Sequence, residues 1–159
     1  FVREGVLEVI RDQLLPLSDV VLPNLSELGW LVGGSIGPLS DALNAARALL
    51  ERGPRVVVIT GVEENTEIAA YGVSADGVWR AAATRRDRRF NGTGDLFAAL
   101  FTRWFLRSKD LASALSATVA GLDLVTGETE RRGTKELAII PMLPWLKMTG
   151  EQRPAGKIN

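Results

Sequence analysis

The sequence predicts an α/β fold with a mostly parallel sheet flanked by helices and with an added β-hairpin. Residues 20–22 and 55–60 carry consecutive rather than alternating apolar residues, which is typical of strands covered on both faces. The segments around them repeat apolar residues at helical spacing, so helices and strands alternate along the chain. Asp76-Gly77, between two further strand-like stretches, is a hairpin turn signal.

The first 60 residues predict helix, strand, helix, helix and strand. Val6, Ile10 and Leu14 recur every four residues with charged residues between them, which indicates an amphipathic helix. Prolines and glycines mark where the helices end. The expected elements are residues 6 to about 16, 20–22, 25–32, 40 or 41 to 53, and 55–60.

The remaining residues predict the hairpin, two helices and a last strand. From Leu96 to about Arg107 large apolar side chains share one face, so this helix should be central and buried. An alanine-rich helix should begin at Lys109 or Asp110. The expected elements are a hairpin of 68–73 and 78–82, helices over 96–107 and 110–125, a loop over 126–133, and a strand over 137–140.

We expect residues 1–147 to form part of one domain and residues 148–159 to form a polar tail. The 159 residues are enough for an ordinary domain core. The chain opens on Phe1 rather than methionine and is already close to a helical pattern there. We therefore interpret it as a piece of something longer.

The composition excludes several kinds of chemistry. The chain has no cysteine and no histidine, so thiolate or imidazole metal sites and Ser-His-Asp catalysis are excluded within it. Acid–base work must fall to Asp, Glu, Lys or Tyr. Lysine plus arginine equals aspartate plus glutamate at 19 each, and no apolar run approaches a membrane span. We expect no nucleic-acid or membrane partner and a cytoplasmic location.

The stretch Gly92-Thr93-Gly94-Asp95 is the strongest candidate site. Two glycines bracket a threonine, an aspartate follows, and an apolar helix pattern begins at once. Such a turn can direct backbone N–H groups and the positive end of a helix at an anion, beside a carboxylate. The alternative is a plain strand-to-helix turn capped by Thr93 or Asp95, which does not explain the two glycines.

Three further segments are candidates of lower specificity. Asn24 and Glu27 follow the 20–22 strand, where they form either a capping box or a group of oxygen ligands for Mg²⁺. Thr60 ends the 55–60 strand, as a turn residue or as a phosphate contact. Arginines fill most of 85–89 and recur at 131–132, where they are either solvated or meet a nucleotide phosphate.

At these residues the chain resembles the pyridoxal kinases of the ribokinase-like superfamily. Residues 92–99 are similar to the family's anion-hole and catalytic motif, and residues 21–28 to its Pro-Asn-x-x-Glu segment. Residues 57–60 resemble its strand that ends in a phosphate-contacting Ser or Thr. Glu136-Leu137 with Ile139 resembles its closing strand. The likeness extends over nearly the whole chain in family order.

The resemblance implies a role for each site residue. Asp95 would accept the proton of the substrate 5′-hydroxyl, and the amides of Gly92, Thr93 and Gly94 would stabilise the transferring phosphoryl group. Asn24 and Glu27 would organise Mg²⁺ and the ATP phosphates, and Thr60 would contact a phosphate. The implied reaction is ATP-dependent phosphorylation of pyridoxal or a related vitamer, for pyridoxal 5′-phosphate salvage, by a full-length protein that is a homodimer.

The resemblance also leaves alternatives. Family members carry a front half with the substrate pocket, and this chain starts after it, so we expect residues 1–159 alone to bind nucleotide weakly without turnover. Other ribokinase-like kinases act on sugars or hydroxymethylpyrimidine; the former usually have Ala in place of Thr93 and the latter tend to have Cys in place of Asp95. A truncated, non-catalytic nucleotide-binding scaffold and a purely structural domain are the remaining alternatives.

Overall fold

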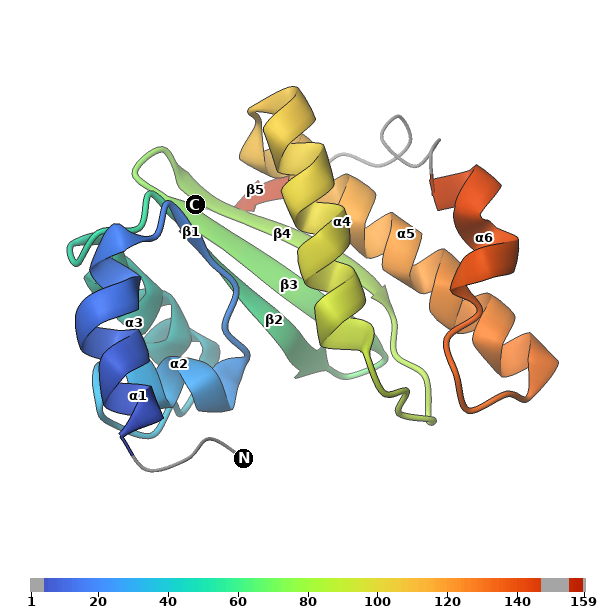
Figure 1. Cartoon of the computed structure of the whole chain (residues 1–159), viewed down its shortest axis with the longest axis horizontal. Helices are drawn as coiled ribbons and strands as arrows, with labels where there is room; N and C mark the ends of the chain where they lie inside the picture. Colours follow the sequence, from blue (N-terminus) through green and yellow to red (C-terminus); the bar gives the residue numbers. More distant parts are fainter. Residues whose placement is uncertain (1–4, 147–154, 159) are drawn as a thin grey trace. The chain divides into compact units, whose positions relative to one another are not determined.

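The computed structural model describes residues 5–146 and 155–158, and its elements are coloured along the chain in Figure 1. In chain order they are α1 (Val6–Val9), the π-helix η1 (Ile10–Leu14), the 3₁₀-helix η2 (Leu15–Leu17), β1 (Val20–Val21), α2 (Leu25–Val32), α3 (Leu39–Leu50), β2 (Val56–Glu64), β3 (Glu67–Ser74), β4 (Gly77–Thr84), α4 (Thr93–Ser108), α5 (Leu111–Arg132), α6 (Ile139–Leu146) and β5 (Gly156–Ile158).

The strands form a five-stranded sheet in the order β1-β2-β3-β4-β5. β1 and β2 pair in parallel, with Val20 opposite Val56 and Val21 opposite Val57. Two-residue turns join β2 to β3 and β3 to β4, so these neighbours run antiparallel. The α/β class and the hairpin at Asp76 are confirmed. Among the described strands the sheet is mixed rather than mostly parallel, because β2 continues past Thr60 and turns directly into β3.

The chain divides into two compact units. In the described ranges, the first unit consists of residues 5–62 and 71–78, and the second of residues 63–70, 79–146 and 155–158. Each unit has its own buried side chains, and each carries a different part of the predicted site.

In the first unit, α2 and α3 pack together next to the parallel pair. Leu28, Ala42 and Leu49 have no exposed surface, and neither do residues 57–59 of β2. α3 begins one or two residues before the expected cap, with Pro38 as its N-cap and no side-chain cap bond. Proline suits such a position because its missing N–H would be unpaired there in any case.

In the second unit, α5 packs against both α4 and α6, as Figure 1 shows. The buried face of α4 confirms that this helix is central, and it is made of Leu96, Phe97, Leu100, Phe101 and Trp104. Phe105, further along the same helix, is half-buried and stacks on Phe101 with ring centroids 5.5 Å apart. Among the described helices, none is long and apolar enough to cross a membrane.

Two expected elements after residue 125 are wrong. The expected loop over 126–133 is the last part of α5, which continues to Arg132 and ends at Gly133 in the left-handed conformation. Its polar residues are used inside the helix: buried Thr129 donates to Val125 O at 2.6 Å and accepts from Ala138 N at 2.9 Å. These bonds let a polar segment remain helical and partly buried.

The expected strand over 137–140 is also wrong, since Ile139 begins α6. Pro141 lies in the first turn of this helix, where a missing N–H costs nothing. In the tail, residues 148–154 and 159 lie outside the described residues. Residues 156–158 form β5, which the sequence analysis did not predict.

Gly53 should tolerate no side chain. A Cβ atom there would lie 2.6 Å from Pro16 O and 2.7 Å from Pro16 Cα, and its φ is +142°. We expect Gly53→Ala to lower the free energy of unfolding by about 2 kcal/mol, because backbone atoms and a left-handed φ leave no way to relax. Urea unfolding measures this loss. Gly34→Ala is the matched control, since a Cβ there meets nothing within 4 Å. Equal midpoints for the two variants would contradict the close approach.

Candidate active site

The glycine turn forms the first turn of α4. Gly92 is the N-cap, with φ 81° and ψ 5°, a left-handed conformation that glycine adopts without strain. Thr93 and Asp95 lie inside the helix and no side chain caps it, so the interpretation of either residue as the cap is wrong. The conformation explains the first glycine of the motif.

The backbone at the start of α4 is open. Leu96 N donates to Gly92 O at 3.0 Å as the first bond of the helix, so the N–H groups of residues 93–95 belong to the donors that a helix leaves unpaired. Gly92, Gly94 and Asp95 are exposed, and a Cβ on Gly94 would meet no atom within 4 Å. An anion can therefore approach these donors closely, beside the Asp95 carboxylate.

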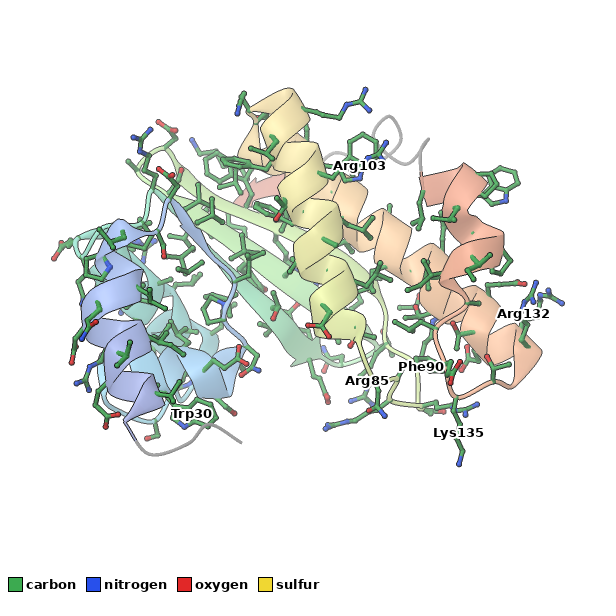
Figure 2. The ribbon with its side chains drawn as sticks, viewed as in Figure 1. Trp30, Arg85, Phe90, Arg103, Arg132 and Lys135 are labelled. Carbon is green, nitrogen blue, oxygen red and sulfur yellow. The ribbon has the colours of Figure 1, made fainter. Side chains whose placement is uncertain are left out.

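Buried aromatic side chains hold this open turn in place. Phe90, two residues before Gly92, is only 9% exposed, and Figure 2 shows it on the segment that joins β4 to α4. Within α4, Phe97 stacks on Phe101 with centroids 6.4 Å apart. Thr93 donates a long bond of 3.4 Å to Phe90 O. The turn thus projects from a packed helix, which favours a fixed geometry.

In the first unit, Asn24 and Glu27 form a capping box at the start of α2. Asn24 Oδ1 accepts from Glu27 N, and Glu27 Oε2 accepts from Asn24 N, both at 2.9 Å. Both residues are exposed. The structural interpretation is therefore correct, while Asn24 Nδ2 and Glu27 Oε1 take no part in the box.

Thr60 lies beside Asn24 at the carboxyl end of the parallel pair. The two residues form an isolated parallel bridge, and Thr60 N donates to Pro23 O at 2.9 Å. The next residue, Gly61, is left-handed with φ +69° and has open space where a Cβ would be. The structure thus brings Asn24, Glu27 and Thr60 together at the edge where open α/β sheets bind ligands.

The donor set fits a magnesium ion only in company with other ligands. Glu27 supplies one carboxylate, half of which is engaged in the capping box. Within the described ranges, no three or more acidic, histidine or cysteine side chains gather as a metal site. Mg²⁺ commonly keeps several waters and is held by one or two carboxylates plus phosphate oxygens. Glu27 with Asn24 suits this way of binding.

The arginines of residues 85–89 have separate tasks. Arg86 is bound to α5, with its Nη2 2.6 Å from Asp123 Oδ1 and its Nη1 3.0 Å from Glu130 Oε2. Arg88 lies over the Phe90 ring, 5.5 Å from the centroid. The other two share one carboxylate, that of Glu63, at 3.2 Å each: Arg85 and Arg89. The side chain of Arg89 is 93% exposed, so it is the freest of the four.

The second arginine pair is engaged within α5. Arg131 donates to both carboxylate oxygens of Glu128, at 2.7 and 2.6 Å, and Arg132 donates to one at 2.6 Å. These bonds, first from Arg131 and then from Arg132, lower the pKa of Glu128 from its ordinary 4.5 to about 2. The structure thus places both arginines in ion pairs within the last turns of α5.

One residue at the turn was missed by the sequence analysis. Leu137 Cδ1 lies 3.8 Å from the place of a Cβ on Gly92, so the segment before α6 runs beside the glycine turn. Leu137 reaches Gly92 because residues 126–132 are helical, and no local sequence pattern indicates that they are. The predicted residues fall into two groups: Asn24, Glu27 and Thr60 in the first unit, and residues 92–95 in the second.

Comparison with known proteins gives consistent matches. The phosphomethylpyrimidine kinase family model matches residues 1–128. A pyridoxal kinase of Leifsonia xyli is 32% identical over 164 residues, covering 100% of this chain and 58% of that protein. Pyridoxal kinase from Entamoeba histolytica is 25% identical with a TM-score of 0.87, covering 99% of this chain and 57% of its own.

A third match shares the fold and was solved with ligands. Pyridoxal kinase from Leishmania donovani, in complex with ADP and pyridoxamine, has a TM-score of 0.86 at 24% identity, covering 100% of this chain and 58% of that chain. The chain therefore spans little more than half the length of these relatives.

Glu128 should titrate at about pH 2 in the folded chain. Because its folded pKa lies below the ordinary 4.5, its contribution to stability is complete above pH 4.5 and is lost as the pH falls through about 2. Arg131→Gln should raise this pKa toward 4.5, because it removes the strongest donor. A carboxyl NMR titration measures the shift, with Arg47→Gln as the control. An unchanged Glu128 pKa in Arg131→Gln would contradict the assignment.

Proposed function

Because this chain belongs to the phosphomethylpyrimidine kinase family, we propose that it is part of an ATP-dependent kinase acting on pyridoxal or a related vitamer. The reaction moves the γ-phosphoryl group of ATP to the substrate hydroxymethyl group. One observation carries the proposal: α4 begins at a left-handed glycine with open amides and an exposed carboxylate in its first turn. An anion cradle beside a base is what transfer of a phosphoryl group to a hydroxyl requires.

Asp95 is the base of this reaction. As the hydroxyl oxygen bonds to phosphorus, its proton passes to the Asp95 carboxylate, while the bond from phosphorus to the ADP oxygen breaks. The transition state of phosphoryl transfer is loose, so a carboxylate suffices and positioning dominates. The amides of residues 92–94 stabilise the charge on the transferring group. The exposure of Asp95 and Gly94 supports these roles.

Asn24, Glu27 and Thr60 are the proposed contacts of the nucleotide phosphates and Mg²⁺. Bound Mg²⁺ would neutralise phosphate charge during the transfer. Glu27 would orient its water ligands, and the Thr60 hydroxyl would donate to a phosphate oxygen. Their common place at the carboxyl end of the parallel β1–β2 pair supports this assignment.

The choice of pyridoxal as substrate rests on the relatives. The Leifsonia xyli and Entamoeba histolytica proteins are pyridoxal kinases, and the Leishmania donovani structure holds ADP and pyridoxamine. A hydroxymethylpyrimidine is the second candidate, favoured by the phosphomethylpyrimidine kinase family model. A substrate panel containing both compounds decides between them.

Asp95→Asn should abolish phosphorylation but not nucleotide binding. The assay joins this chain to the portion of the Leifsonia xyli enzyme that has no counterpart here and follows ADP release with pyridoxal. Loss of the base should lower turnover by about 100-fold or more. Binding of Mg-ATP, measured by calorimetry, should persist.

Asp87→Asn is the control and should keep full turnover, because it changes another exposed carboxyl, in the segment that joins β4 to α4. Full turnover in Asp95→Asn would remove Asp95 from the mechanism. ATP binding without phosphorylation of any compound in the panel would favour a non-catalytic scaffold over a kinase.

Arg89 is the arginine that we propose meets a nucleotide phosphate, since its guanidinium is the most exposed of the four and is 3.2 Å from the Glu63 carboxylate. Arg89→Gln should weaken ATP binding about tenfold, the value of one charge-assisted hydrogen bond. Arg85→Gln removes an arginine from the same Glu63 carboxylate and is the matched control. Calorimetry with ATP and with adenosine separates the two roles, because adenosine affinity should not change. Equal losses in both variants would indicate a general charge effect instead.

A further inference from the structure

The guanidinium of Arg86 donates hydrogen bonds to several residues on one face of α5. Its Nε donates to Thr126 Oγ1 at 3.1 Å, and its Nη1 donates to Glu130 Oε2 at 3.0 Å. Its Nη2 donates to Asp123 Oδ1 at 2.6 Å and to Asp123 O at 3.2 Å. The side chain is 21% exposed. All three guanidinium nitrogens are thus used within the protein.

Gly127 has no side chain and so leaves room on α5 for the Arg86 guanidinium. A Cβ on Gly127 would lie 2.9 Å from Nη2 and 3.5 Å from Cζ of Arg86. Asp123, Thr126 and Glu130 lie three and four residues apart, so they share that face of α5. A planar, forked guanidinium can bind such a set at once, whereas a lysine ammonium offers one point of charge.

Arg86 lies in a connection that has no regular structure of its own. Residues 85–92 join β4 to α4, and they end at the glycine turn. Arg85 N donates to Thr66 O at 2.8 Å near the start of this segment, and Phe90 is buried near its end. Figure 2 shows Arg85 and Phe90 on this connection. Between these two points, the bonds of Arg86 attach the connection to α5.

We propose that Arg86 is a positioning residue for phosphoryl transfer, which ties the connection 85–92 to α5 and so holds the glycine turn in its anion-binding geometry. The effect on phosphoryl transfer rests on the proposed kinase function, whereas the bonds between Arg86 and α5 do not depend on it. In this role Arg86 acts on Gly92–Asp95 rather than on substrate. Buried Phe90 and the packed face of α4 hold the end of the connection, and the bonds of Arg86 add a hold near its start, which reduces the conformations that the eight residues and the turn can adopt.

Arg86 and Gly127 can be tested as a pair. Arg86→Gln removes the tie, and Gly127→Ala pushes the guanidinium from its partners. Each single variant should raise amide hydrogen exchange at Arg85 and Leu96, whose N–H groups are bonded to Thr66 O and Gly92 O at the two ends of the connection, about tenfold, and should weaken Mg-ATP binding about tenfold. Exchange in the core of α4 and α5 should stay as in the wild type. In the Arg86→Gln background, Gly127→Ala should have no further effect, because it acts only through the guanidinium.

The outcomes separate the tie from the kinase function. Unchanged exchange at Arg85 and Leu96 in Arg86→Gln would overturn the proposal, and so would faster exchange throughout α4 and α5, which indicates a general structural role. Additive effects of the two substitutions would overturn the pairing of Arg86 with Gly127. A wild-type chain that binds no Mg-ATP would overturn the proposed function, while exchange measured without nucleotide would still decide whether Arg86 holds the connection.

Discussion

The unpaired amides at the start of α4 are the constraint on which the rest of the second unit depends. A helix start without a side-chain cap costs stability, because its first N–H groups lose the partners that a Ser, Asp or Asn would offer. Gly92 reaches the left-handed conformation that begins the helix, and Gly94 keeps its surface bare. The buried face of α4 offsets the cost and keeps the turn in place.

At the start of α2 a side-chain cap is present, unlike at the start of α4. Asn24 and Glu27 satisfy each other's backbone N–H groups, so that helix start is closed and stable by itself. The remaining side-chain atoms of these residues, next to Thr60, are exposed at the end of the parallel pair. The cap uses Oδ1 of Asn24 and Oε2 of Glu27, which leaves Asn24 Nδ2 as a donor and Glu27 Oε1 as an acceptor for the proposed ligand contacts.

The arginines of the second unit mainly contact other groups of the same unit. Arg86 and the pair Arg131 and Arg132 are held by carboxylates of α5, and Arg88 lies over Phe90. An arginine-rich segment therefore does not act as one basic patch. Its guanidinium groups have different partners within the protein, and Arg89 has the greatest exposure.

Local patterns were enough for much of the fold and for the choice of candidate site residues. The apolar runs at 20–22 and 56–59 became β1 and part of β2, and α2 matched its predicted bounds. The hairpin predicted at Asp76-Gly77 formed with residues 75–76 as its turn and Gly77 as the first residue of β4. These features depend on neighbours within a few residues, such as periodicity, turn residues and caps. The motif at 92–95 was likewise visible from its glycines.

The sequence by itself determined that strands and helices alternate and that an aspartate follows a glycine turn at the start of a buried helix. Tertiary structure alone decided that residues 126–132 are helical, that 139–146 form α6, and that Leu137 lies beside Gly92. It also decided which arginine is bound and which is exposed. These outcomes depend on partners far along the chain, such as Asp123 for Arg86 and Thr129 for Ala138, and no local pattern contains them.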